Sequence, residues 1–148
     1  MTNKMIGLIA VYAVIMAGLL YVTFAEEWNP SGNTYSVEDQ TLTIEQGVFS
    51  KDTRTIDMKG KQADVLRYFL AMSVEREHWR QDLTVIGLIL PFLLFIFYRD
   101  RRPFKSYVSY GWYVTIIAAI AVLYAAYSIP GHVSEIQDIH QQVNQLTS

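Results

Sequence analysis

The chain has 148 residues, which is the size of one ordinary domain. Hydrophobic residues make up 51% of it and charged residues only 18%, against about 25% in a typical soluble domain, so the composition argues against an ordinary water-soluble protein. The formal net charge of −2 gives no general attraction to nucleic acid, and the absence of cysteine excludes disulfides and thiolate metal sites.

Three segments contain no Asp, Glu, Lys, Arg or His and hold most of the apolar residues: 5–25, 83–98 and 107–129. A helix needs about 20 apolar residues to cross a hydrocarbon core of about 30 Å. The first and third segments are long enough, and the second is long enough if Thr84 and Tyr98 lie at the membrane interfaces. The sequence therefore predicts a mainly α-helical integral membrane protein with three transmembrane helices.

Residues 1–25 are predicted to form the first transmembrane helix, with Lys4 on its cytoplasmic side. Residues 23–25 have the small-residue pattern of a signal cleavage site, but the apolar stretch exceeds the roughly 7–15 residues of a cleaved signal peptide. We therefore expect an uncleaved signal anchor. Ala13 and Ala17 lie one turn apart on this helix, and such small-residue faces let membrane helices approach closely.

Residues 26–82 are predicted to form an extracytoplasmic insertion with two parts. Between residues 34 and 58, threonine alternates with apolar residues, which is typical of short half-buried strands. Three such strands bury little area, so we expect a small sheet that is only marginally stable alone. Residues 61–82 show helical spacing instead. Because no helix breaker separates them from the second apolar segment, one helix over residues 62–98 is expected.

Residues 99–106 connect the second and third transmembrane helices and carry four basic side chains: Arg99, Arg101, Arg102 and Lys105. Lys and Arg close to the ends of transmembrane helices are retained on the cytoplasmic side. The residues that directly follow the first helix and the C-terminal tail contain neither. The charge pattern therefore predicts a multi-pass protein of the cell membrane with a cytoplasmic N-terminus and an extracytoplasmic C-terminus.

Residues 107–129 are predicted to form the third transmembrane helix, and Ala121 and Ala125 give it a second small-residue face. Pro130 and Gly131 are expected to end that helix.

Residues 130–148 are then expected to form a separate extracytoplasmic helix. Its apolar seam consists of Ile136, Ile139, Val143 and Leu146. A seam of two heptads is too short to be stable alone, so the tail needs a partner. The helix at residues 61–82 is one candidate, in an arrangement that places Arg76 opposite Glu135.

All three histidines lie in the outer segments, and with nearby carboxylates they are candidate metal ligands: His78, His132, His140, Glu75, Glu77, Glu135 and Asp138. Borderline divalent metals accept imidazole and carboxylate ligands. The spacing matches no specific metal motif, so solvated histidines on polar helices are the alternative interpretation. Inside the apolar segments, the absence of acidic, basic and histidine side chains argues against an ion pathway or a haem ligand.

The sequence contains no phosphate-binding loop or nucleophile motif, and we expect neither enzymatic activity nor a cofactor. The leading hypothesis is a non-catalytic accessory or assembly subunit that docks on other integral membrane subunits, or on itself. Two alternatives stay open. One is an outer-face metal-binding or ligand-sensing protein that uses the histidines, and the other is a small subunit of a membrane oxidoreductase with its redox centres in other chains. Membrane lipid is an expected partner, and nucleic acid is not.

Overall fold

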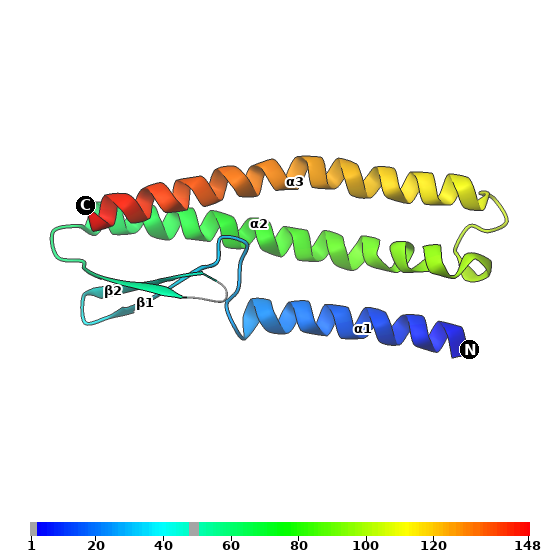
Figure 1. Ribbon diagram of the computed structural model, residues 1–148, viewed down its shortest axis with the longest axis horizontal. Helices are drawn as coiled ribbons and strands as arrows, with labels where there is room; N and C mark the ends of the chain where they lie inside the picture. Colours follow the sequence, from blue (N-terminus) through cyan, green and yellow to red (C-terminus); the bar gives the residue numbers. More distant parts are fainter. Residues whose placement is uncertain (1–2, 48–50) are drawn as a thin grey trace.

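Three long helices dominate the computed structural model, which describes residues 3–47 and 51–148 (Figure 1). They are α1 (Asn3–Phe24), α2 (Gln62–Leu94) and α3 (Tyr110–Thr147). Each of them is long and apolar enough to cross a membrane. The N-terminus and the α2–α3 connection lie at one end of the molecule, and the sheet and the C-terminus lie at the other (Figure 1). The prediction of a mainly helical chain with three candidate spanning helices and a small sheet is confirmed.

The sheet between α1 and α2 has three antiparallel strands in chain order: β1 (Asn33–Glu38), β2 (Thr41–Gln46) and β3 (Asp52–Asp57). Leu42 and Ile44 on the central strand are fully buried, whereas Thr43 between them is only half-buried. This alternation arises because successive side chains of a strand point to opposite faces. One face of the sheet therefore turns toward the helices, as the threonine-rich pattern predicts.

One hydrophobic core joins the sheet to the outer halves of α2 and α3. Its buried residues are Leu42, Ile44 and Ile56 from the sheet, Val65, Tyr68, Ala71 and Met72 from α2, and Ile139, Val143 and Leu146 from α3. Three of the four residues of the predicted tail seam are therefore buried inside this chain, and Ile136 is half-buried. The tail packs on α2 and the sheet, so its apolar seam is covered without another protein.

α3 continues through Pro130 and Gly131, so the expected break before a separate tail helix is wrong. A proline inside a helix removes one hydrogen bond and crowds the preceding turn, at a cost of about 3 kcal/mol. Ser128 and His132, which lie on either side of Pro130 and Gly131, are both buried against α2. Their contacts, together with the core beyond them, hold the helix in one piece.

α2 is continuous from the outer segment into the apolar segment, as predicted, but the α-helix ends at Leu94 and a 3₁₀ turn, η1 (Phe95–Phe97), follows. Pro91 lies in the last turn and cannot donate a hydrogen bond to the carbonyl of Gly87, four residues earlier. The hydroxyl of Tyr12 in α1 donates to that carbonyl at 3.0 Å. α1 thereby satisfies a backbone group that the proline leaves free, as neighbouring helices do in membranes.

Candidate functional site

Polar side chains fill the interface between α2 and α3 around the outer ends of the apolar segments 83–98 and 107–129. α2 contributes Glu75, His78 and Asp82, and α3 contributes Tyr124, Ser128, His132 and Glu135. Spacings of three and four residues place each set on a single helix face. Four members of the cluster are buried: Glu75, Asp82, Ser128 and His132. Buried polar groups are costly unless they are paired, so the contacts within the cluster decide what it can do.

The two imidazole rings stack face to face, with centroids 3.8 Å apart and planes inclined by only 2°. Nδ1 of His132 lies 2.7 Å from a carboxylate oxygen of Glu75, and Nδ1 of His78 lies 2.9 Å from one of Glu135. The Nε2 atoms face the other side, where His132 contacts Asp82 and His78 lies 3.3 Å from the Ser128 hydroxyl. Both Nδ1 atoms thus face glutamates at the outer side of the ring pair.

Asp82 is the centre of the inner side of the cluster. The hydroxyls of Ser128 and Tyr124 donate to it at 2.8 and 2.5 Å, and Nε2 of His132 contacts its other oxygen. Burial opposes ionisation, but the hydrogen bonds from Tyr124, His132 and Ser128 outweigh it and hold the pKa of Asp82 below its usual value. An ionised Asp82 accepts a hydrogen bond from the N–H group at Nε2 of His132. The Nδ1 lone pair of that ring is then free to face Glu75.

Glu75 has no exposed surface, and its Oε2 atom has no hydrogen-bond partner among the described residues. Burial and the nearby carboxylates of Glu135 and Asp82 raise the pKa of Glu75 to about 9. A buried polar atom without a partner costs about 1–3 kcal/mol. The site is therefore short of positive charge beside Glu75.

Four residues offer one ligand atom each, and these atoms all lie within 4.8 Å of one another: Glu75, His78, His132 and Glu135. In a tetrahedral zinc site with bonds of about 2.0–2.1 Å, the ligand atoms lie roughly 3.3 Å apart. To reach that spacing, the ligand atoms have to approach one another by at most about 1.5 Å. The donor set of two imidazole nitrogens and two carboxylates is one that zinc-class ions accept.

A cleft of about 460 Å³ leads to the cluster from the surface, and it is lined by Glu77, His78, Glu135 and Gly131 together with Ser73, Val74, Gln81 and Tyr127. The cleft reaches His78 and Glu135 directly, whereas Glu75 lies behind them and is fully buried. A small cation therefore has a route from solvent to the carboxylates, and the acidic side chain of Glu77 lies along that route.

Four of the seven predicted metal ligands meet in the cluster: Glu75, His78, His132 and Glu135. His140 is exposed further along α3 and is not part of it. The expected pairing of Arg76 with Glu135 is wrong: the guanidinium of Arg76 lies 5.1 Å from the centre of the Tyr35 ring, and Glu135 contacts His78. Position 76 lies about 100° around the helix from Glu75, so it cannot share the face that meets α3.

The inner residues of the cluster were not among the predicted ligands: Asp82, Tyr124 and Ser128. A usable signal existed in α3, where Tyr124, Ser128 and His132 recur at intervals of four residues and form one polar stripe.

The predicted small-residue faces of α1 and α3 are not part of this cluster. Ala13 and Ala17 on α1 are exposed, and Ala121 and Ala125 on α3 are half-buried.

Gly131 makes room for the ring stack. A Cβ atom at this position would lie 2.9 Å from Cε1 of His78, whose ring is held by His132 and Glu135. We predict that Gly131→Ala destabilises the protein by about 1–3 kcal/mol, the usual cost of overpacking. Gly18→Ala in α1 is the control. Nothing lies within 4 Å of its added Cβ, so it should stabilise the helix by up to about 1 kcal/mol. Thermal unfolding measures both, and equal stabilisation would contradict the close approach.

Comparison with known protein families, with curated proteins and with solved structures finds no match for this chain. The cluster between α2 and α3 therefore has to be understood from its own geometry and chemistry.

Proposed function

We propose that this chain is an integral membrane protein that binds a divalent transition metal ion of the zinc class between the outer parts of α2 and α3. The observation that carries the proposal is the buried carboxylate of Glu75, which has one unpartnered oxygen and faces two histidines and a second glutamate. A divalent cation supplies the missing partner. It also offsets the repulsion between Glu75 and Glu135.

The ligands proposed are the carboxylates of Glu75 and Glu135 and the Nδ1 atoms of His78 and His132. Both Nδ1 atoms already face those carboxylates, at 2.9 Å for His78 and 2.7 Å for His132. Asp82 does not bind the metal in this arrangement, because it contacts the Nε2 atom of His132. It acts as an outer partner that fixes the proton and the orientation of the ring, as carboxylates do behind many metal-bound histidines.

Four protein ligands complete a tetrahedral site and leave no open position for a substrate. Closed sites of this kind are typical of structural zinc, whereas catalytic zinc keeps a position for water. This supports the expectation that the chain is not an enzyme. A metal ion between α2 and α3 joins two helices that the sheet packs against, so metal binding would increase the rigidity of the outer part of the protein. We therefore propose a metal-binding or metal-sensing role.

Asp82 provides a prediction that separates the metal site from a simple polar contact. Asp82→Asn keeps the shape of the side chain but weakens its hold on the proton at Nε2 of His132. We expect zinc affinity to fall by about 10–100-fold, as it does when outer partners are lost. Asp138→Asn removes the same charge from an exposed position of α3 and should change affinity less than twofold. Competition with a chromophoric chelator measures both constants, and equal effects of the two variants would contradict the proposed role.

The binding proposal can be tested by thermal unfolding of the purified chain in detergent. Zinc at 100 times its dissociation constant should stabilise the folded state by about 2.7 kcal/mol. Magnesium prefers oxygen ligands in an octahedral arrangement and should give a much smaller shift at the same concentration. No shift with zinc, or equal shifts with both ions, would contradict a zinc-class site.

We further propose that the N-terminus is cytoplasmic and the metal site extracytoplasmic. The basic α2–α3 connection lies at the same end of the molecule as the N-terminus (Figure 1), in agreement with retention of Lys and Arg in the cytoplasm. Because the chain has no cysteine, Ser106→Cys and Ser148→Cys each introduce a single reactive thiol. In intact cells, a membrane-impermeant maleimide should label position 148 and not position 106. The reverse pattern would contradict this orientation.

Docking on another membrane protein, or on a second copy, is a second candidate function. Of the residues described in α1, only Leu8 is buried, and the small-residue face with Ala13 and Ala17 is exposed. Lipid supplies no hydrophobic drive for helix association, so such faces favour close packing with another helix. Purification in a gentle detergent should retain a stoichiometric partner or a homo-oligomer, and Ala17→Leu should release it. A monomeric wild-type chain would contradict this function.

A further inference from the structure

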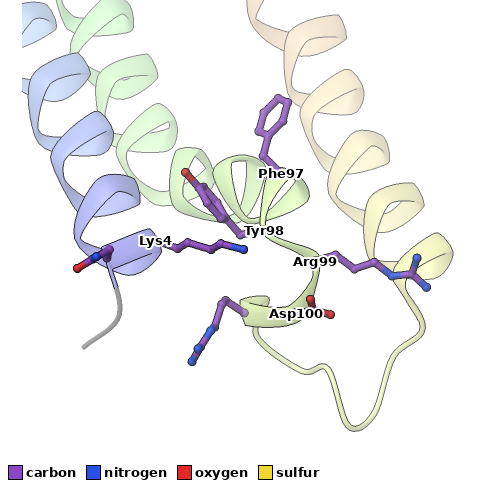
Figure 2. Close-up of a pocket in the computed structure, with 7 residues that line it drawn as sticks. Lys4, Phe97, Tyr98, Arg99 and Asp100 are labelled. Carbon is purple, nitrogen blue, oxygen red and sulfur yellow. The ribbon is translucent and has the colours of Figure 1, made fainter.

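A second cavity lies at the end of the molecule that holds the N-terminus, between the start of α1 and the α2–α3 connection (Figure 2). Its volume is about 500 Å³, and it is lined by Asn3 and Lys4 of α1 and by Phe97, Tyr98, Arg99, Asp100 and Arg101. The last three form a 3₁₀ turn, η2 (Arg99–Arg101). The cavity thus joins the two regions of positive charge that flank the apolar segments.

Two of the basic residues in the connection are engaged in its own structure. Arg102 is buried and donates to the backbone carbonyls of Arg99 and Val108 at 2.8 and 2.9 Å. The guanidinium of Arg99 lies 5.0 Å from the centre of the Tyr110 ring, and Figure 2 shows this side chain directed away from Lys4. The Arg102 guanidinium is therefore committed to the backbone of the connection, and that of Arg99 is directed toward Tyr110.

Lys4 and Arg101 differ from these two residues. Both are exposed, and in the described part of the chain neither side chain is paired with a carboxylate or engaged in a hydrogen bond. Figure 2 shows Lys4 extending from α1 toward the connection. Two like charges that lie far apart in the sequence therefore line one cavity, and the positive end of the α1 dipole lies beside them. Asp100 also lines the cavity and reduces this positive charge in part.

Apolar groups border the same cavity. Phe97 is 81% exposed, and Tyr98 lies beside it at the end of the second apolar segment. This is the depth at which a bilayer changes from acyl chains to phosphate groups, and basic pockets at such positions favour anionic headgroups. We propose that the cavity binds a phosphate ester, with Lys4 and Arg101 as its cationic contacts. The sources of that chemistry are the headgroup of an anionic phospholipid and a soluble phosphate ester.

The test uses the full chain in nanodiscs, so that both leaflets have the same composition and the orientation of the protein does not matter. Retention of lipid is measured by native mass spectrometry in discs of phosphatidylcholine doped with phosphatidylglycerol, with and without added glycerol phosphate. A basic residue near a membrane surface contributes about 1 kcal/mol, which corresponds to roughly a fivefold change in affinity. Lys4→Gln and Arg101→Gln should each weaken retention of phosphatidylglycerol by about fivefold, and the double variant by about 25-fold.

Lys105→Gln is the matched control, because Lys105 lies in the same connection but does not line the cavity. It should weaken retention less than twofold. Displacement of the lipid by millimolar glycerol phosphate would identify a soluble ester as the ligand, and resistance to displacement would identify the lipid; both results support the site. Equal effects of all three substitutions, or no preference for phosphatidylglycerol over phosphatidylcholine and no binding of glycerol phosphate, would overturn it. An unchanged zinc response in each variant verifies that the chain is folded.

Discussion

Replacing His132 by alanine is expected to abolish zinc binding, whereas replacing His140 on the same helix should leave it unchanged. His132 is buried and contacts Glu75 through one ring nitrogen and Asp82 through the other, while His140 is exposed and outside the cluster. Loss of an outer partner typically reduces metal affinity about 10–100-fold. Removal of a ligand should reduce zinc affinity by more than this. Competition with a chromophoric chelator measures the two dissociation constants.

His132→Ala leaves Glu75 and Asp82 buried without their imidazole partner, which lowers the stability of the fold. A second variant is therefore needed to separate loss of zinc binding from loss of the fold. His78→Ala removes the other proposed nitrogen ligand, which lies closer to the cleft. It should also lose zinc binding while the helix content measured by circular dichroism stays unchanged. Loss of zinc binding in His140→Ala to the same extent, or full affinity in folded His78→Ala, would contradict the proposed ligand set.

Glu75→Gln is expected to lose the zinc response and yet to leave the metal-free protein at least as stable as the wild type. Glutamine keeps the volume and a hydrogen-bonding group toward His132, and it is neutral like the protonated Glu75 that the raised pKa gives the metal-free folded protein. If Glu75 instead forms a buried ion pair with His132, the variant is less stable than the wild type, since breaking such a pair costs about 3–5 kcal/mol. Thermal unfolding with a chelator and with zinc measures both properties.

The pH dependence of this variant follows from the pKa of Glu75, which burial and neighbouring carboxylates raise from 4.5 to about 9. A raised pKa means that the folded state retains a proton that the unfolded state releases. The wild-type metal-free protein therefore loses stability as pH rises from about 5 to about 9, and Glu75→Gln does not. The difference between them should grow with pH. Glu77→Gln, which changes an exposed carboxylate, is the control and should unfold like the wild type at each pH.

Periodicity in the sequence was enough to predict most of the fold. The three apolar segments and the alternation of threonine with apolar residues around Leu42 and Ile44 correspond to the observed helices and sheet. The break expected at Pro130 was wrong because local propensity was outweighed by tertiary contacts. Ser128 and His132 pack on α2 from both sides of the proline. These are tertiary contacts, which the local sequence around Pro130 does not reveal.

The candidate site was only partly predictable. Residue types identified Glu75, His78, His132 and Glu135 as possible ligands, and the charge pattern predicted that they lie on one side of the membrane. The rotation of α2 about its axis decides whether Arg76 or His78 faces Glu135, and one residue of helix turns the side chain by about 100°. The packing of Val65, Tyr68, Ala71 and Met72 into the core sets that rotation. The supporting role of Asp82 depends on the same rotation.

Elemental analysis of the purified full-length chain is the most direct test of the metal site. The protein is equilibrated with zinc and then dialysed against metal-free buffer, and the metal that stays bound is counted for the wild type and for Glu75→Gln. The proposed site predicts one zinc ion per wild-type chain and none in the variant. A wild-type chain that retains no zinc, or a variant that retains as much as the wild type, would contradict it.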